Sequence, residues 1–167
     1  MKRSLLALLV LFAFVAGCKK DDNNTPATDN KTLLTKTWIA SKVTGNASGL
    51  TITVYTKGAT TNLYDKFKNF SVSLKADGTY SSNDTEGTTT TGTWTLSSDG
   101  KTLTLTASTG SKVVYTVNSV SSTAASFKYT IDLSAQSTFV TAIVQLAAAQ
   151  GVTVKTGDYL TFDVIPQ

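Results

Sequence analysis

Apolar and polar residues alternate along most of the chain after residue 33, and this period of two predicts β-strands that bury one face. Phe70, Val72 and Leu74, for example, are separated from one another by serine residues. Many of the polar positions are threonine, whose branched side chain favours strands. The pattern predicts strands over residues 36–44, 50–57, 67–76, 78–83, 91–97, 101–107, 111–118, 125–133 and 158–165.

Two Asp-Gly pairs, Asp77-Gly78 and Asp99-Gly100, lie between predicted strands. Glycine accepts the positive φ that tight turns require, so both pairs predict hairpins. Residues 83–91 predict either a long exposed connection or a frayed strand pair. Successive hairpins indicate an antiparallel meander with one face in water. About eight such strands can close into a barrel, although the pattern also fits a two-sheet sandwich.

One segment breaks the alternation. Ser137 is placed to cap a helix that runs through Phe139 and Ile143 to Gln150, because the apolar positions there follow a period of 3.6. Gly151 then follows as the C-terminal cap. We therefore expect an all-β domain with one helix before the last strand. Such a helix covers an open end of the barrel or packs on its wall, and a mobile lid is the alternative role.

The first residues have the parts of an export signal. Lys2 and Arg3 form a basic start, and residues 5–16 are an uncharged apolar run. This run is shorter than the roughly 20 residues that a spanning helix needs, so it indicates a signal peptide. Residues 15–18, Val-Ala-Gly-Cys, resemble the lipobox of bacterial lipoproteins. The resemblance implies cleavage after residue 17 and attachment of lipid to the thiol of Cys18, which holds the protein to a membrane.

The chain is thus predicted to have three parts: a cleaved signal peptide (1–17), a lipidated cysteine with a flexible tether (18–32), and a β-barrel domain (33–167). The tether is predicted because residues 19–32 contain few apolar side chains to bury. A lysine followed by an acidic pair, as at residues 20–22, resembles the signal that sends some lipoproteins to the cell surface. We expect an outer-membrane lipoprotein at the cell surface, with a periplasm-facing position as the alternative.

Charge adds one exclusion. Removal of Lys2 and Arg3 with the signal leaves 13 of the 15 cations, against 11 acidic residues, so the net charge falls from +4 to +2. The mature chain contains no arginine, the residue best suited to bidentate phosphate recognition. Nucleic acid is therefore not an expected partner.

Three segments, 33–38, 70–80 and 91–105, resemble the lipocalin-like domains of bacterial surface lipoproteins. Lipocalins carry Gly-x-Trp in the first strand, where the tryptophan closes one end of the barrel; here Lys36 replaces the glycine before Trp38. The resemblance implies a barrel that holds a small apolar ligand. Inward-facing aromatic residues either line that ligand site or fill the barrel as core, and the candidates are Trp38, Phe70, Trp94, Tyr115, Phe127, Tyr129 and Phe162.

The chain lacks the residues of most catalytic sites. It has no histidine, and Cys18 is its only cysteine, which excludes the usual serine triad and most zinc sites. Asn83, Asp84 and Glu86 offer oxygen atoms to Ca²⁺ but do not complete a binding-loop motif. Four further carboxylates show no diagnostic spacing: Asp65, Asp132, Asp158 and Asp163. We expect no enzymatic activity, no metal and no cofactor.

Three functions follow from these observations. The leading hypothesis is a lipid-anchored lipocalin-like binder of a small apolar ligand, which predicts an enclosed apolar cavity. The second is a non-enzymatic interaction or scaffold module that binds protein or glycan through exposed aromatic residues such as Tyr55, Tyr64 or Tyr159, and it predicts a filled core. A hydrolase with paired carboxylates is a remote third.

Overall fold

The computed structural model describes residues 27–135 and 137–167. The signal peptide predicted at residues 1–17, the lipidation site predicted at Cys18 and the first part of the tether lie outside the described residues. These three expectations stay predictions.

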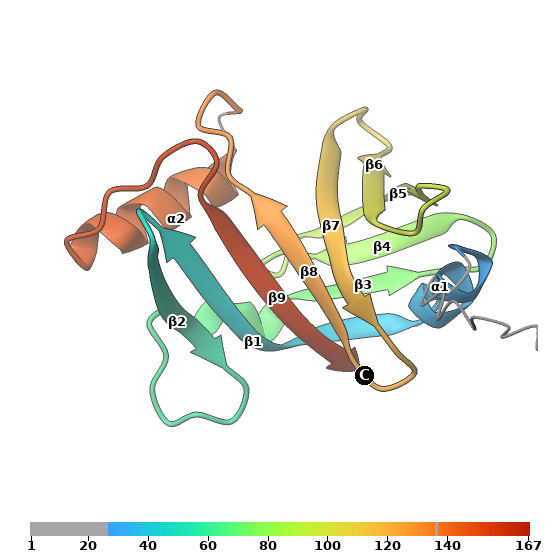
Figure 1. Ribbon diagram of the computed structural model, residues 1–167, viewed down its shortest axis with the longest axis horizontal. Coiled ribbons are helices and arrows are strands. Elements are labelled where there is room, and N and C mark those ends of the chain that lie inside the picture. Colours follow the sequence, from blue (N-terminus) through green and yellow to red (C-terminus); the bar gives the residue numbers. More distant parts are fainter. Residues whose placement is uncertain (1–26, 136) are drawn as a thin grey trace, which may run out of the picture.

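The described chain is all-β and forms a closed antiparallel barrel of eight strands, with one extra strand and one helix before the last strand (Figure 1). Around the barrel the strands follow the order β1, β3, β4, β5, β6, β7, β8 and β9, and β9 pairs back onto β1. This closure excludes the sandwich. The strands are β1 (Thr37–Ala47), β2 (Leu50–Thr56), β3 (Ser71–Leu74), β4 (Thr79–Asn83), β5 (Thr89–Leu96), β6 (Thr102–Ala107), β7 (Lys112–Val120), β8 (Ala125–Thr130) and β9 (Tyr159–Pro166).

Strand β1 closes the barrel because both of its edges are occupied. One edge pairs with β9 from Trp38 to Asn46. The other edge is shared, since residues 37–39 pair with β3 and residues 42–47 pair with β2. The extra strand β2 therefore extends the wall along the half of β1 that the short strand β3 does not reach.

The strand predicted over residues 67–76 is wrong in its first part. Residues Asp65–Asn69 form a 3-10 helix, η1, and the strand begins only at Ser71. The aromatic residues Tyr64, Phe67 and Phe70 are spaced by three, which matches one turn of a 3-10 helix and not a strand. This turn buries Phe67 completely.

Residues 83–91, predicted as a long exposed connection or a frayed strand pair, form the paired ends of β4 and β5 and a short hairpin turn between them. Strand β4 reaches Asn83 and β5 begins at Thr89, so few residues lie between them. The carboxylate of Asp84 accepts hydrogen bonds from the backbone N–H groups of Glu86 (2.9 Å) and Thr88 (2.8 Å). An Asp side chain that binds backbone donors in this way fixes a turn.

The predicted helix is confirmed as α2 (Thr138–Ala149). The Ser137 hydroxyl accepts a hydrogen bond from the Val140 N–H, as an N-cap does. Gly151 has a φ of 71°, and the N–H of Val152 donates to the C=O of Ala147. With the bond from the N–H of Gly151 to the C=O of Ala148, this bond forms a Schellman C-cap, in which the residue with positive φ is usually glycine.

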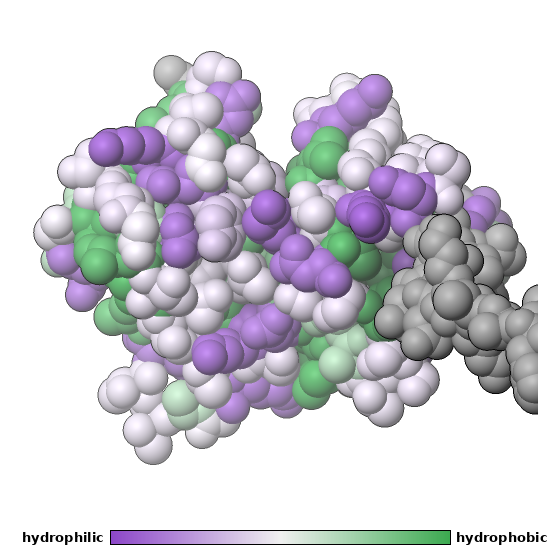
Figure 2. Space-filling model, viewed as in Figure 1, coloured by the Kyte–Doolittle hydropathy of each residue, from purple (hydrophilic) through white to green (hydrophobic). Residues whose placement is uncertain are grey.

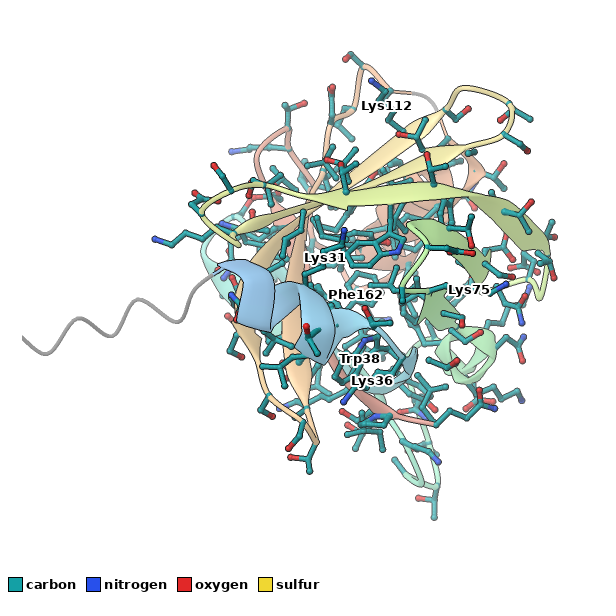
Figure 3. The ribbon with its side chains drawn as sticks, turned by 90° about the vertical axis from the view of Figure 1, so that its right-hand side faces the viewer. Lys31, Lys36, Trp38, Lys75, Lys112 and Phe162 are labelled. Atoms are coloured by element: carbon teal, nitrogen blue, oxygen red, sulfur yellow. The ribbon has the colours of Figure 1, made fainter. Side chains whose placement is uncertain are left out.

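A second helix, α1 (Ala27–Leu34), was not indicated by the alternation and lies against one end of the barrel (Figure 3). The flexible tether predicted for residues 18–32 is therefore wrong over residues 27–32. Leu34 is fully buried, and its C=O accepts a hydrogen bond from the indole N–H of Trp38 (2.9 Å). The ammonium group of Lys31 lies 5.5 Å from the ring centre of Trp94, a cation–π contact.

No helix in the described part of the chain is long and apolar enough to cross a membrane.

Gly92 offers a direct test of the barrel wall. A Cβ atom at this position in β5 would lie 2.0 Å from the backbone oxygen of Thr106 in the paired strand β6. We expect Gly92→Ala to lower the free energy of unfolding by about 3 kcal/mol, because the backbone has to move. Gly45→Ala is the matched control, since its Cβ meets only ordinary contacts and should change the stability by less than about 1 kcal/mol. Denaturant unfolding measures both, and equal stabilities would contradict this register.

Candidate functional site

The interior of the barrel holds six of the seven aromatic residues predicted there. Their rings form one connected set, with centroid separations from 5.0 Å to 6.4 Å. The six are Trp38, Phe70, Tyr115, Phe127, Tyr129 and Phe162. The seventh, Trp94, is buried in the same hydrophobic core but contacts none of these rings, and its indole N–H donates to the C=O of Lys75 (2.9 Å).

Two further aromatic residues complete this set. Phe67 of η1 lies 5.7 Å from Phe162, and Phe139 of α2 lies 5.6 Å from Tyr129. Sequence reasoning missed both, because Phe67 was assigned to a strand and Phe139 only to a covering helix. We call these eight residues the aromatic cluster. All eight belong to the hydrophobic core or pack against it, so in this structure the aromatic candidates are core residues.

Three tyrosines place phenol groups in the barrel interior. Burial raises the pKa of the Tyr115 phenol strongly, and the neighbouring Tyr129 and Tyr80 raise it further. Burial also raises the pKa values of Tyr80 and Tyr129. All three phenols are therefore neutral at physiological pH.

An apolar cavity of about 50 Å³ lies between α2 and the β1–β2 hairpin. Leu63, Ile143 and Leu146 are among the aliphatic side chains around it. Sites for small organic ligands usually measure 300–1,000 Å³, so this cavity is too small for one as it stands.

A larger hollow of about 440 Å³ lies on the outer face of β4, β5 and β6, and we call it the outer hollow. Most of its lining residues carry a hydroxyl group, and the others are a glycine, an alanine and a lysine. Its lining residues are Lys75, Thr79, Tyr80, Ser81, Thr91, Gly92, Thr93, Thr106, Ala107 and Ser108. Apart from its hydroxyl-rich strands, the sequence carried no signal for this site.

Most hydroxyls of the outer hollow are available to a ligand. Within the described residues, the side chains of Ser81, Thr93 and Thr106 make no hydrogen bond. The Thr79 hydroxyl instead donates to the carboxylate of Asp77 (2.7 Å). That bond, with the one from the Thr79 N–H, lowers the pKa of Asp77, so a fixed negative charge lies beside the rim. The hollow thus offers donors and acceptors together.

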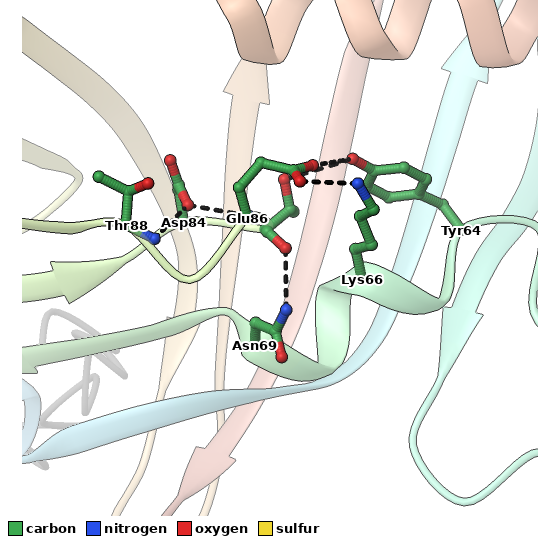
Figure 4. Close-up of polar contacts among 7 residues, drawn as sticks. Tyr64, Lys66, Asn69, Asp84, Glu86 and Thr88 are labelled. Carbon is green, nitrogen blue, oxygen red and sulfur yellow. Dashed lines mark hydrogen bonds and ion pairs between the residues drawn. The ribbon is translucent and has the colours of Figure 1, made fainter.

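The residues considered for Ca²⁺ have structural partners instead (Figure 4). Glu86 accepts hydrogen bonds from Tyr64 (3.0 Å) and Lys66 (2.6 Å), which join the β4–β5 turn to η1 and lower the pKa of Glu86. The Asn69 amide donates to the backbone C=O of Thr85, the one buried polar residue of the described chain. This network positions η1, and hence Phe67, in the core.

The unassigned carboxylates do not converge on a cleft. Asp65 pairs with Lys68 in η1, and Asp132 accepts from Ser134 in the turn after β8. Asp158 accepts from the backbone N–H groups of Ser48 and Lys155. Among the described residues, no three His, Cys, Asp or Glu side chains are grouped so as to hold a metal.

The exposed aromatic surface expected of an interaction module is absent from the described chain. Tyr55 is only 4% exposed, so that expectation is wrong for it. Tyr64 is half-buried and bound to Glu86, and Tyr159 is half-buried beneath the ammonium group of Lys128 (5.4 Å). The large exposed apolar residues are all aliphatic: Leu50, Leu63, Val113, Val114 and Leu133.

Comparison of the sequence with models of known protein families gives no match, and comparison with curated proteins finds no similar sequence. The site therefore has to be judged from its own geometry.

The buried phenol of Tyr115 predicts a pH dependence. Its pKa is higher in the folded protein than in the unfolded chain, where tyrosine titrates near 10. The resulting stability is complete below that value and is lost as the pH rises through the folded pKa. In an alkaline titration followed by phenolate absorbance, Tyr115→Phe should remove the phenol that ionises at the highest pH. Loss of an early-ionising phenol would contradict the buried position.

Proposed function

We propose that this chain is an exported lipoprotein, anchored to a membrane by lipid on Cys18, and that its lipocalin-like barrel is a non-enzymatic binding module. We further propose that the outer hollow is the binding site and that its ligand is a carbohydrate. The volume of the outer hollow, about 440 Å³, carries this assignment, because it lies in the range of small-ligand sites.

The chemistry of the outer hollow supports a polyhydroxylated ligand. Serine and threonine hydroxyls donate and accept hydrogen bonds, as sugar hydroxyls do. Ser81, Thr93 and Thr106 have no partner within the described residues, so a ligand would replace water and break no bond of the protein. Lys75 and the nearby Asp77 supply one charge of each sign, which favours neither an acidic nor a basic ligand.

Binding of a small apolar ligand stays a prediction, but the structure restricts where it could occur. The aromatic cluster fills the barrel interior, so such a ligand would have to enlarge the 50 Å³ cavity beneath α2. Displacement of α2 would break the contacts of Phe139 with Phe67 and Tyr129. The outer hollow needs no such rearrangement, and for this reason we favour the carbohydrate.

The anchor is supported by the sequence around Cys18. A lone thiol in an exported protein has no disulfide partner, and lipidation explains it. A fully processed lipoprotein carries more than one acyl chain, which is what stable attachment requires.

We expect Cys18→Ala to abolish incorporation of a fatty-acid analogue and to leave the signal peptide uncut. Metabolic labelling followed by gel electrophoresis measures both effects. Cys18→Ser serves as a control that conserves size and polarity, and it should also fail because the acyl acceptor is a thiol. Labelling of Cys18→Ala at the level of the natural chain would refute the anchor.

The ligand assignment can be tested with threonine-to-valine changes, which keep the β-branched shape and remove the hydroxyl. Thr93 and Thr106 are cross-strand partners that both line the outer hollow. We expect Thr93→Val with Thr106→Val to weaken binding to an immobilised oligosaccharide panel about ten-fold or more, at roughly 0.5–1.5 kcal/mol for each lost hydrogen bond.

The matched control is Thr95→Val with Thr104→Val. This pair lies on the same two strands, directly opposite each other, but outside the hollow. Binding should be retained there. Equal losses in both double variants, or no binding of the natural protein to any member of the panel, would overturn the carbohydrate assignment.

A further inference from the structure

The barrel wall is open between one end of β7 and the corresponding end of β8. The two strands pair from Val120↔Ala125 up to Thr116↔Lys128, and there the pairing stops. Strand β7 continues to Lys112 paired only with β6, while β8 continues to Thr130 paired only with β9. In Figure 1 the two strands diverge above this point, and Figure 2 shows a notch there in the molecular surface.

The free edge of β7 carries backbone groups that point into the notch. The N–H of Val117 donates to the C=O of Lys101, so Val117 faces β6. Because successive residues of a strand direct their backbone groups to opposite edges, those of Lys112 and Val114 face the notch. Past the Thr116↔Lys128 pair, no described strand pairs with this edge.

The opposite wall of the notch has the same character. The N–H of Ile131 donates to the C=O of Asp158 toward β9, so the backbone groups of Thr130 point toward β7. Val114 and Thr130 would form the next hydrogen-bonded pair after Thr116 and Lys128, but the strands have separated there. Two strand edges with unused donors and acceptors therefore face each other.

Side chains around the notch suit an extended peptide with one apolar face. Val113 is 36% exposed and Val114 is 50% exposed, on opposite faces of β7. Val113 shares the inner face of the sheet with Leu105 and Tyr115. The ring centroids of Tyr115 and Tyr129 lie 6.0 Å apart across the opening. Apolar side chains of an added strand would meet these residues on the inner side.

The described chain covers part of its other sheet edge, the second half of β2, whereas it leaves the edge of β7 bare. On β2, the C=O of Val54 accepts from the N–H of Tyr64, and the N–H of Thr56 donates to the Asn62 side chain. Covering of this kind protects proteins from unwanted strand pairing. The edge of β7 has no such cover among the described residues.

We propose that the notch binds an extended peptide segment of a partner protein, which adds as a strand to β7. Strand addition takes affinity from main-chain hydrogen bonds and specificity from alternate side chains. A second copy of the chain fits poorly, because the edge spans only Lys112–Tyr115 and stable dimers bury about 1,200–2,000 Å². The chain's own residues 19–26 contain no aliphatic or aromatic side chain to face Val113.

The probe is a fluorescein-labelled peptide of alternating threonine and valine, added to the mature protein in detergent. We expect Val114→Pro to weaken its binding about ten-fold or more, because proline removes the N–H that faces the notch and leaves the bonds to β6 intact. Val114→Thr, which keeps the N–H and the branched shape, should bind within about two-fold of the natural protein. The same peptide with N-methylated valines should not bind.

Hydrogen exchange of the natural protein decides the question even where Val114→Pro fails to fold. The amides of Lys112 and Val114 should exchange fast without the peptide and slowly with it, while that of Val113 is protected throughout. No binding, or no protection, overturns the proposal. Without the peptide, protection of these amides that grows with protein concentration would identify a second copy as the occupant. Protection without the peptide that is lost when residues 19–26 are deleted would identify the chain's own tether. Either result also overturns the proposal. The outer hollow lies on other residues, so these outcomes are independent of the carbohydrate assignment.

Discussion

The pairing of β1 with β9 is the contact on which the rest of the structure depends. It joins the first and last strands of the chain, from Trp38↔Pro166 to Asn46↔Tyr159, and turns a meander into a barrel. Local hairpins form most other strand pairs, so this is the pairing with the largest loop to close. The closure also places Phe162 of β9 against Phe67 and Phe70, which come from the segment that follows β2.

Filling of the barrel decides where binding can occur. In a small barrel the interior is either packed with side chains or holds one ligand. Here Phe67 enters from η1 and Phe139 from α2, and both contact Phe162 of the wall. The η1 turn is held by the bonds of Lys66 and Tyr64 to Glu86, so a surface network positions a core residue. With the centre occupied, the two binding sites that we propose lie on the outer face and at the open edge of β7.

Much of the fold could be predicted because local signals agree with it. Alternation fixes the strands, Asp-Gly pairs mark two hairpins, and Ser137 with Gly151 bounds the helix. The 3-10 turn at Phe67 was missed because polar residues flank it as they would in a strand. Helix α1 was missed because its stability comes from tertiary contacts, namely the Trp38 bond to Leu34 and the Lys31 contact with Trp94. The outer hollow depends on how three strands curve, which alternation does not encode.

The position of the notch is consistent with a membrane anchor at the other end of the molecule. Helix α1 leads into β1 near the β7–β8 turn, where the ammonium group of Lys36 donates to the C=O of Ser122 (2.9 Å). The notch opens at the far ends of the same two strands, beyond Thr116 and Lys128 (Figure 1). With the lipid anchor that we propose at Cys18, the anchored segment would join the barrel through α1, at the opposite end of β7 from the notch.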